Sequence, residues 1–327
     1  MLSLTCAISD YDHVRDLASG RVRAEGIDLQ ILDMPVEEAF FRMIRFEEFD
    51  ISEMSMGRYV SMMSQGDDRF VAIPVFPSRM FRHSSVYVRK DRGIGSAADL
   101  AGRTVGVPEW AQTAGIYIRG ILAHHHGLRL QDVHWVQAGI HQPGREEEVK
   151  IGLPDGYRLT RMADRTLNDM LMSGELDAVI SAHPPRCAET ENASIGRLFE
   201  DFTAVERAFW QTTGIFPIMH AIVLRRGVFE RHRWIASNLL AAFSQAKARS
   251  MARLREVTAA RVPLPWSFDY ARQTAAAFGD DYWPYGVDAN RTTLTAFLRY
   301  AREQGVISRP LTPEDLFPAE VRARFKI

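Results

Sequence analysis

The chain of 327 residues is poor in cysteine and lysine and has no long apolar run. It contains two cysteines, Cys6 and Cys187, and only four lysines among its 40 basic residues. So few cysteines exclude a disulfide scaffold, and neither one forms a CxxC motif or a Cys/His spacing suited to zinc. Cys6 lies in the apolar stretch LSLTCAI, which favours a small buried side chain there.

An excess of charge of one sign is also missing, because the formal net charge is -1. A nucleic-acid-binding domain normally carries a clear basic excess, so we expect no nucleic-acid partner. No window is long and apolar enough to cross a bilayer, so we expect no membrane partner. The first residues, MLSLTCAISDYDHV, lack the basic and apolar regions of a signal peptide, which favours a cytoplasmic protein.

What the sequence does contain is an alternation of strand-like and helix-like segments. Predicted strands span 2–8, 26–34, 48–55, 70–77, 84–90, part of 99–110, 132–138, 176–182 and 219–229. Predicted helices span 36–46, 57–66, 111–127, 164–175, 233–254 and 290–305. Such alternation implies an α/β fold with mostly parallel sheets flanked by helices.

The alternation restarts once, and the chain then returns towards its first unit. We therefore predict two lobes with a cleft at the hinge. Residues 1–88 and 218–327 are assigned to the first lobe and residues 89–217 to the second. The chain is 46% hydrophobic, which is enough for two packed cores.

Several stretches carry a resemblance. The order DLAGRTVGVPEW, LMSGELDAVISAHPP and HAIVLRRGVF resembles the type II periplasmic-binding-protein-like fold. More narrowly, IPVFPSRMFRHSSVYVR and WPYGVDANRTTLTAFLRYAREQGV are similar to the 4,5-dihydroxyphthalate decarboxylase family, with further similar stretches between about Asp50 and Val306. The sequence departs from the family pattern at His183, within SAHPPRC. The resemblance implies a cofactor-free aromatic carboxy-lyase that converts 4,5-dihydroxyphthalate to 3,4-dihydroxybenzoate.

Polar residues follow several predicted strands at the edge where open α/β sheets bind ligands. Ser9 and Asp10 follow the first strand, Ser55 follows the third, and Thr113 follows the first strand of the second unit. Free N–H groups at the adjoining helix N-termini favour anions. We predict that these four residues contact the substrate, and simple capping of the helices is an equally weighted alternative.

The loop FPSRMFRHSS, residues 76–85, holds the cations Arg79 and Arg82. Arginines bind carboxylates through charge-assisted bidentate bonds, so both are predicted to hold the substrate carboxylates. Composition alone favours a solvated loop, or pairing with acids such as Asp67 and Asp91. The resemblance is specific across this loop and favours the anion site.

Proton transfer is assigned to His83, His220 or Glu109. A histidine titrates near neutrality and therefore both gives and takes a proton readily. A structural histidine beside a strand is the common alternative. Glu109 would qualify if its neighbours Pro108 and Trp110 keep it dry.

His183 precedes a Pro-Pro pair and is predicted to contact the substrate, or else to be a rigid turn residue. His124, His125 and His126 do not suggest a metal site, because adjacent helix positions point about 100° apart. No metal ligands are therefore predicted.

Two other functions remain open at this point. A solute-binding protein would capture a small aromatic or carboxylate anion without chemistry, and its fold would be the same. An enzyme of this fold with different carboxylate chemistry is the third hypothesis, to which the departure at His183 points. In each case the partner is a small-molecule aromatic carboxylate, and a homo-oligomer is compatible with the size of the chain.

Overall fold

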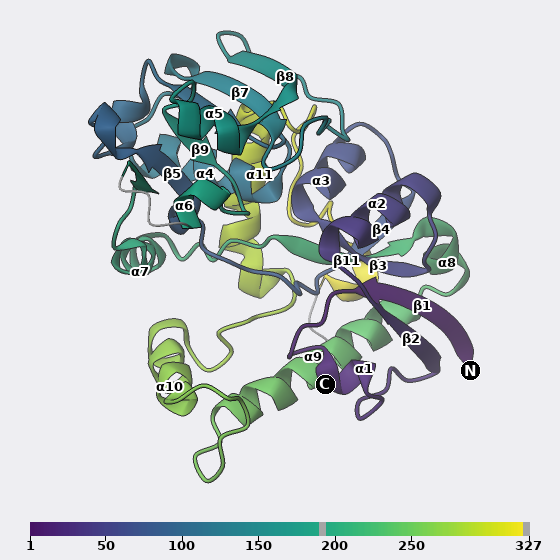
Figure 1. The fold of residues 1–327 in the computed structure, drawn as a ribbon. Coiled ribbons are helices and arrows are strands. Elements are labelled where there is room, and N and C mark those ends of the chain that lie inside the picture. The colour runs from purple at the N-terminus through teal and green to yellow at the C-terminus, as the bar shows by residue number, and fades with distance from the viewer. Residues whose placement is uncertain (190–193, 323–327) are drawn as a thin grey trace.

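The computed structural model describes residues 1–189 and 194–322 and shows two α/β lobes (Figure 1). The sheet of the first lobe has the strand order β2-β1-β3-β11-β4. Its strands are β1 (Leu2–Ile8), β2 (Ile27–Asp33), β3 (Ile51–Ser55), β4 (Phe70–Ile73) and β11 (His220–Arg225). All five residues of β3 are buried, as expected for the central strand of a covered sheet.

The sheet of the second lobe has the order β10-β5-β9-β6-β7-β8. Its strands are β5 (Val86–Arg89), β6 (Thr104–Val107), β7 (His134–Gly139), β8 (Arg158–Thr166), β9 (Ala178–Ile180) and β10 (Ile195–Arg197). The two-lobed α/β fold expected from the sequence is thereby confirmed. The predicted boundary after residue 88 runs through β5, and the domain limits themselves stay a prediction.

Both sheets are mixed, with one strand in each running opposite to the others. In the first sheet β11 runs antiparallel to β3 and β4, and in the second β5 runs antiparallel to β9 and β10. Both β11 and β5 follow segments that cross between the lobes, so each enters its sheet at the edge where the neighbouring strands end. As a result, the first residue of β11, His220, lies beside the last residue of β3, Ser55.

The helices cover both sheets. They are α1 (Arg15–Ala18), α2 (Val36–Phe46), α3 (Met56–Ser64), α4 (Thr113–His125), α5 (Leu167–Ser173), α6 (Arg186–Glu189), α7 (Phe202–Thr213), α8 (Arg226–Arg231), α9 (Ile235–Leu254), α10 (Ser267–Phe278) and α11 (Arg291–Glu303). The predicted helix 164–175 is shorter, since its first residues end β8. The predicted strand 219–229 stops at Arg225, where α8 follows.

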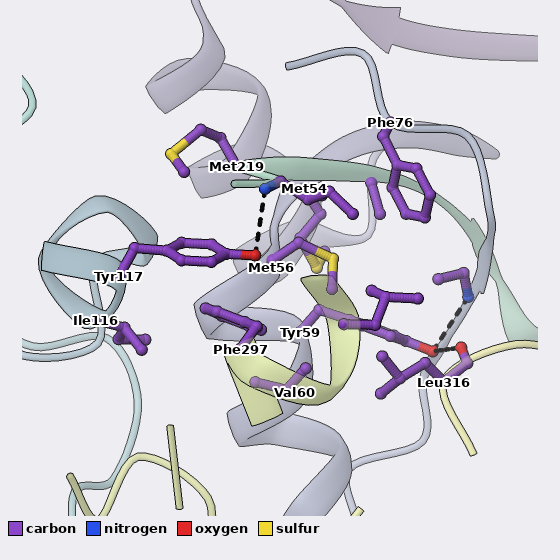
Figure 2. Packing of buried hydrophobic residues seen from close by; sticks show 14 of the residues in the cluster. Met54, Met56, Tyr59, Val60, Phe76, Ile116, Tyr117, Met219, Phe297 and Leu316 are labelled. Atoms are coloured by element: carbon purple, nitrogen blue, oxygen red, sulfur yellow. Dashed lines mark hydrogen bonds between the residues drawn. The ribbon is translucent and has the colours of Figure 1, made fainter. Parts of the chain in front are cut away.

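The C-terminal helix α11 packs on α4 of the second lobe. The rings of Tyr117 and Phe297 stack with centroids 4.8 Å apart, and the Tyr300 ring lies against Gly120 so closely that a side chain there would clash. In Figure 2 the Tyr117 hydroxyl accepts a hydrogen bond, which comes from the backbone N–H of Ile218 at 3.2 Å. Helix α11, which the sequence assigns to the first lobe, therefore contacts the second lobe as well.

Candidate functional site

The N-termini of α3 and α4 meet between the lobes. The Ser55 hydroxyl lies 2.8 Å from the Thr113 hydroxyl, which also accepts the backbone N–H of Gly57 at 2.9 Å. A Cβ at Gly57 would lie 2.2 Å from the carbonyl oxygen of Ala111, so only glycine permits this approach. The predicted pair Ser55 and Thr113 is thus brought together from opposite lobes.

Beside this contact lies a cluster of three ionisable side chains. Nδ1 of His220 is 2.5 Å from Oε1 of Glu53, and the Tyr11 hydroxyl donates to the same oxygen at 2.6 Å. Oε2 of Glu53 accepts the backbone N–H of Ser9 at 3.2 Å. We call Glu53, His220 and Tyr11 the Glu53 cluster.

Burial sets the electrostatics of the Glu53 cluster. The Glu53 side chain is 0% exposed and that of His220 is 16% exposed. The Phe40 ring from α2 meets the imidazole edge-on, with centroids 4.9 Å apart. Burial, together with the negative charge of Glu53, raises the pKa of Tyr11, so this phenol stays protonated and donates.

Arg82 is the loop cation that could hold an anion. Its Nε donates to the Met219 sulfur at 3.4 Å, and within residues 1–189 and 194–322 it forms no ion pair with a carboxylate. Burial lowers its pKa. Its positive charge opposes the effect of Glu37 on the pKa of His183. A half-buried arginine without a carboxylate partner suits a carboxylate ligand.

Glu109 forms ion pairs with two arginines. Arg58 of α3 lies 3.1 Å from Oε2 of Glu109, and Nε of Arg145 donates to Oε1 at 2.6 Å. Arg58 also pairs with Glu148 at 2.9 Å. Both oxygens of this carboxylate are bound by guanidinium groups, which argues against the predicted role in proton transfer.

A second contact between the lobes joins His183 to Glu37 of α2, with Nε2 and Oε1 2.8 Å apart. The hydrogen bond to Glu37 raises the pKa of His183. Glu37, Arg58 and Glu109 line a groove of about 1070 Å³ between α2, the 139–148 segment and Arg186, and His183 contacts it through Glu37. The groove therefore carries charges of both signs.

Glu147, from the segment after β7, contacts the residues that lead into α4. Its carboxylate accepts the backbone N–H groups of Trp110 at 2.5 Å and Ala111 at 3.1 Å. Burial, helped by the nearby charge of Glu109, raises the pKa of Glu147 to about 7. This carboxylate occupies two backbone donors that would otherwise suit an anion.

Arg79 bonds to the protein itself. The buried guanidinium donates to the carbonyl oxygens of Phe216 at 3.2 Å and Pro284 at 2.7 Å, and to the Asn290 side chain. Burial lowers its pKa to about 10. Arg79 therefore holds the 76–85 loop against the segment around Pro284. These bonds do not support the expectation that Arg79 binds a substrate carboxylate.

His83 also lies apart from the Glu53 cluster. Its ring packs edge-on against Phe199 and Phe209, with centroids 5.4 and 5.2 Å away, and its backbone N–H donates to Glu206 at 3.0 Å. Neither ring nitrogen has a hydrogen-bond partner in the described part of the chain. These aromatic contacts correspond to the structural histidine that was the alternative to a catalytic one.

The two residues predicted after the first strand have different surroundings. Ser9 touches Glu53 through its backbone N–H, whereas Asp10 is exposed to solvent. Sequence reasoning did not select Glu53, Tyr11 or Arg58. Tyr11 lies three residues after the end of β1, so a search beyond that strand end would have found it, whereas Glu53 lies in the middle of β3.

Among residues 1–189 and 194–322, no group of three His, Cys, Asp or Glu side chains is arranged to hold a metal ion. Within the same ranges, no helix combines the length and apolar character needed to cross a bilayer.

Comparison with known proteins first defines the fold class. The NMT1/THI5-like family model matches residues 22–144. The periplasmic aliphatic sulphonate binding protein SsuA from Escherichia coli superposes with a TM-score of 0.56 at 12% identity, covering 97% of each chain. The Candida albicans CA3427 product, which has the generic periplasmic binding protein fold, gives 0.51 at 10% identity over 100% of this chain and 99% of its own. The protein therefore has the periplasmic-binding-protein fold.

Sequence relatives then give the family. The 4,5-dihydroxyphthalate decarboxylase of Comamonas testosteroni is 37% identical over 327 residues, which is 100% of this chain and 99% of the relative. The Pseudomonas putida enzyme of the same name is 41% identical over 201 residues, covering 61% of this chain and 78% of that protein. The chain belongs to the 4,5-dihydroxyphthalate decarboxylase family.

Proposed function

We propose that this protein decarboxylates 4,5-dihydroxyphthalate to 3,4-dihydroxybenzoate without oxidation. The observation that carries the proposal is the 37% identity to the Comamonas testosteroni enzyme along the whole chain. The Glu53 cluster supports it, because a histidine and a buried carboxylate at the meeting point of two lobes suit proton transfer.

The reaction needs one proton per turnover. The ring hydroxyl para to the leaving carboxylate pushes electron density onto the carbon that bears this carboxylate. A protein acid forms a C–H bond there, the C–C bond to the carboxylate breaks, and its electron pair restores the aromatic ring as carbon dioxide leaves. We assign the acid to His220, since Glu109 is paired with Arg58 and Arg145 and His83 lies in an aromatic cluster.

Substrate binding is assigned to Arg82, with the hydroxyls of Ser55 and Thr113 beside it. A phthalate has two adjacent carboxylates, and the one that stays needs a fixed counter-charge. Arg82 is available for this role, whereas Arg79 is held by backbone carbonyls and Asn290. His183 would adjust the charge of the groove through its contact with Glu37.

A capture protein remains the second candidate, since the sulphonate binding protein shares the fold. It would need Arg82 but would gain nothing from a histidine held by a buried carboxylate. The reaction as written calls for neither a redox cofactor nor a metal, so we propose that turnover survives a chelator.

We also propose a cytoplasmic homo-oligomer. The support for self-association is a set of exposed apolar side chains before and within α10, including Leu264 at 53%, Trp266 at 70% and Tyr270 at 55% exposure. Light scattering on the purified protein tests it, and a mass of about 37.1 kDa at all concentrations would contradict it.

The activity is tested by incubating chelator-treated protein with 4,5-dihydroxyphthalate and measuring carbon dioxide and 3,4-dihydroxybenzoate. We expect Arg82→Ala to raise KM at least tenfold, because a charge-assisted bond to a carboxylate is worth about 1.5–3 kcal/mol. Arg207→Ala, on the exposed side of α7, is the matched control and should leave KM unchanged. Binding of the substrate without any product would favour the capture protein.

A further inference from the structure

We propose that Glu53 and Tyr11 are positioning residues that act on the reaction through His220. Glu53 fixes the imidazole so that Nε2 is the ring atom that gains and loses the proton, and Tyr11 fixes Glu53. The effect on turnover rests on the function proposed above, whereas the state of the imidazole is measurable without it.

The backbone places the two side chains together. His220 opens β11 opposite Ser55, and Glu53 stands two residues before Ser55 in β3. Alternate residues of a strand share a face, so His220 and Glu53 are diagonal neighbours on one face of the sheet. The two residues are 167 positions apart in the sequence, and the pairing of β3 with β11 brings them together. A contact between two central strands is more rigid than one carried by a loop.

The hydrogen bonds define which nitrogen is free. A carboxylate only accepts hydrogen bonds, so the 2.5 Å contact requires a hydrogen on Nδ1 of His220. That hydrogen is needed whether the ring is neutral or charged. The proton that moves during the reaction must therefore be carried by Nε2.

Tyr11 and Ser9 hold Glu53 in turn. The Tyr11 hydroxyl donates to Oε1 at 2.6 Å and the Ser9 backbone donates to Oε2 at 3.2 Å, so both carboxylate oxygens are anchored. Because Tyr11 follows β1, the neighbour of β3 in the sheet, the orientation of the carboxylate is set from a second strand end.

The remaining surroundings prevent the imidazole from turning away. The Phe40 ring meets it edge-on at 4.9 Å, and Glu53 is fully buried, so water does not compete for the carboxylate. A buried carboxylate is costly unless it is paired. Glu53 is paired with a histidine and a phenol rather than with a guanidinium, so its negative charge is directed at the group that becomes an imidazolium.

The charge of Glu53 acts on Tyr11, Cys6, His13 and Tyr285, and the Ser78 hydroxyl bonds to Tyr11. The His13 ring lies 5.3 Å from that of Tyr11, and burial lowers the pKa of His13 to about 4, so this second imidazole is neutral near neutral pH. None of these groups is then a cation. Glu53 is therefore the counter-ion that the described structure provides for a charged His220.

The test compares Glu53→Gln, Glu53→Asp and Tyr11→Phe with the exposed control Glu25→Gln. For Glu53→Gln we expect kcat to fall about 10²-fold with KM within threefold, since acid catalysis contributes at least that factor. Glu53→Asp should recover part of the loss because the charge is kept. Tyr11→Phe, which leaves the carboxylate in place, should reduce kcat several-fold.

The second readout is the ¹⁵N spectrum of the His220 ring in protein without substrate. Neutral wild-type imidazole should carry its hydrogen on Nδ1, and Glu53→Gln should shift hydrogen to Nε2 or mix the two forms. A wild-type ring with its hydrogen on Nε2 would overturn the proposal, as would a folded Glu53→Gln variant with kcat within threefold of wild type. If the wild type turned over no substrate, the proposed function would fail while the spectrum still decided the positioning role.

Discussion

The two lobes each bring one buried glutamate to the region where they meet, and the two differ in their partners. Glu53 of the first lobe accepts hydrogen bonds from His220, Tyr11 and a backbone N–H. Glu109 of the second lobe is paired with Arg58 and Arg145. An imidazole exchanges protons near neutrality, whereas a guanidinium does not.

The difference in partners suggests a catalytic role for the Glu53 cluster and a structural role for the Glu109 ion pairs. The Glu53 cluster contains an imidazole, the group to which we assign the proposed proton transfer. The Glu109 pairs join α3 of the first lobe to the second lobe, so they are suited to holding the lobes together. Two residues of the same type and similar burial thus have different partners, and on that ground we propose different roles for them.

The largest effect on stability should come from Glu109→Gln. Removing the carboxylate leaves buried Arg58 with Glu148 as its remaining ionic partner, and breaking a buried pair costs about 3–5 kcal/mol. Denaturant unfolding measures this loss, with Glu53→Gln unfolded in parallel. If folded Glu109→Gln loses as much kcat as Glu53→Gln does, the proposed distinction between a structural Glu109 and a catalytic Glu53 cluster is wrong.

A smaller effect should appear in the pH dependence of stability through Glu147. Its pKa is raised from 4.5 to about 7, so the folded protein keeps this proton to a higher pH than the unfolded chain does. The unfolding free energy should therefore fall as the pH rises from 4.5 to about 7, by about 2 kcal/mol after allowance for partial exposure. Above that range the contribution of Glu147 is constant.

Glu147→Gln cannot ionise and should flatten this part of the stability profile, while Glu146→Gln, on the exposed neighbour, should keep it. Urea unfolding at pH 5 and pH 7.5 distinguishes the variants. An equal slope in wild type and Glu147→Gln would show that the pKa of Glu147 is not raised in the folded protein.

The strands and the two-lobed architecture could be predicted because they depend on local alternation of apolar and polar residues. β8 was missed, since most of its side chains are exposed and its polar sequence RLTRMADRT lacks a buried face. The loop with Arg79, Arg82 and His83 was found at a strand end. Its sequence could not show that Arg79 would be held by Pro284 and Asn290, about 200 residues further on.

The same limit applies to the candidate site. His220 was selected for its residue type, but its partner Glu53 depends on the register of two antiparallel strands, which no local pattern encodes. Ser55 and Thr113 were predicted separately as helix ends, and their contact follows from the docking of the two lobes. Residue chemistry at strand ends was readable from the sequence, whereas the pairing between distant strands was not.

The measurement that tests the account most directly is decarboxylation of 4,5-dihydroxyphthalate by chelator-treated wild type and His220→Gln under single-turnover conditions. We predict one carbon dioxide per substrate with the wild type, and a rate at least 10²-fold lower with a variant that still binds the substrate. Turnover by His220→Gln within threefold of wild type would contradict His220 as the proton donor, and with it the role assigned to Glu53.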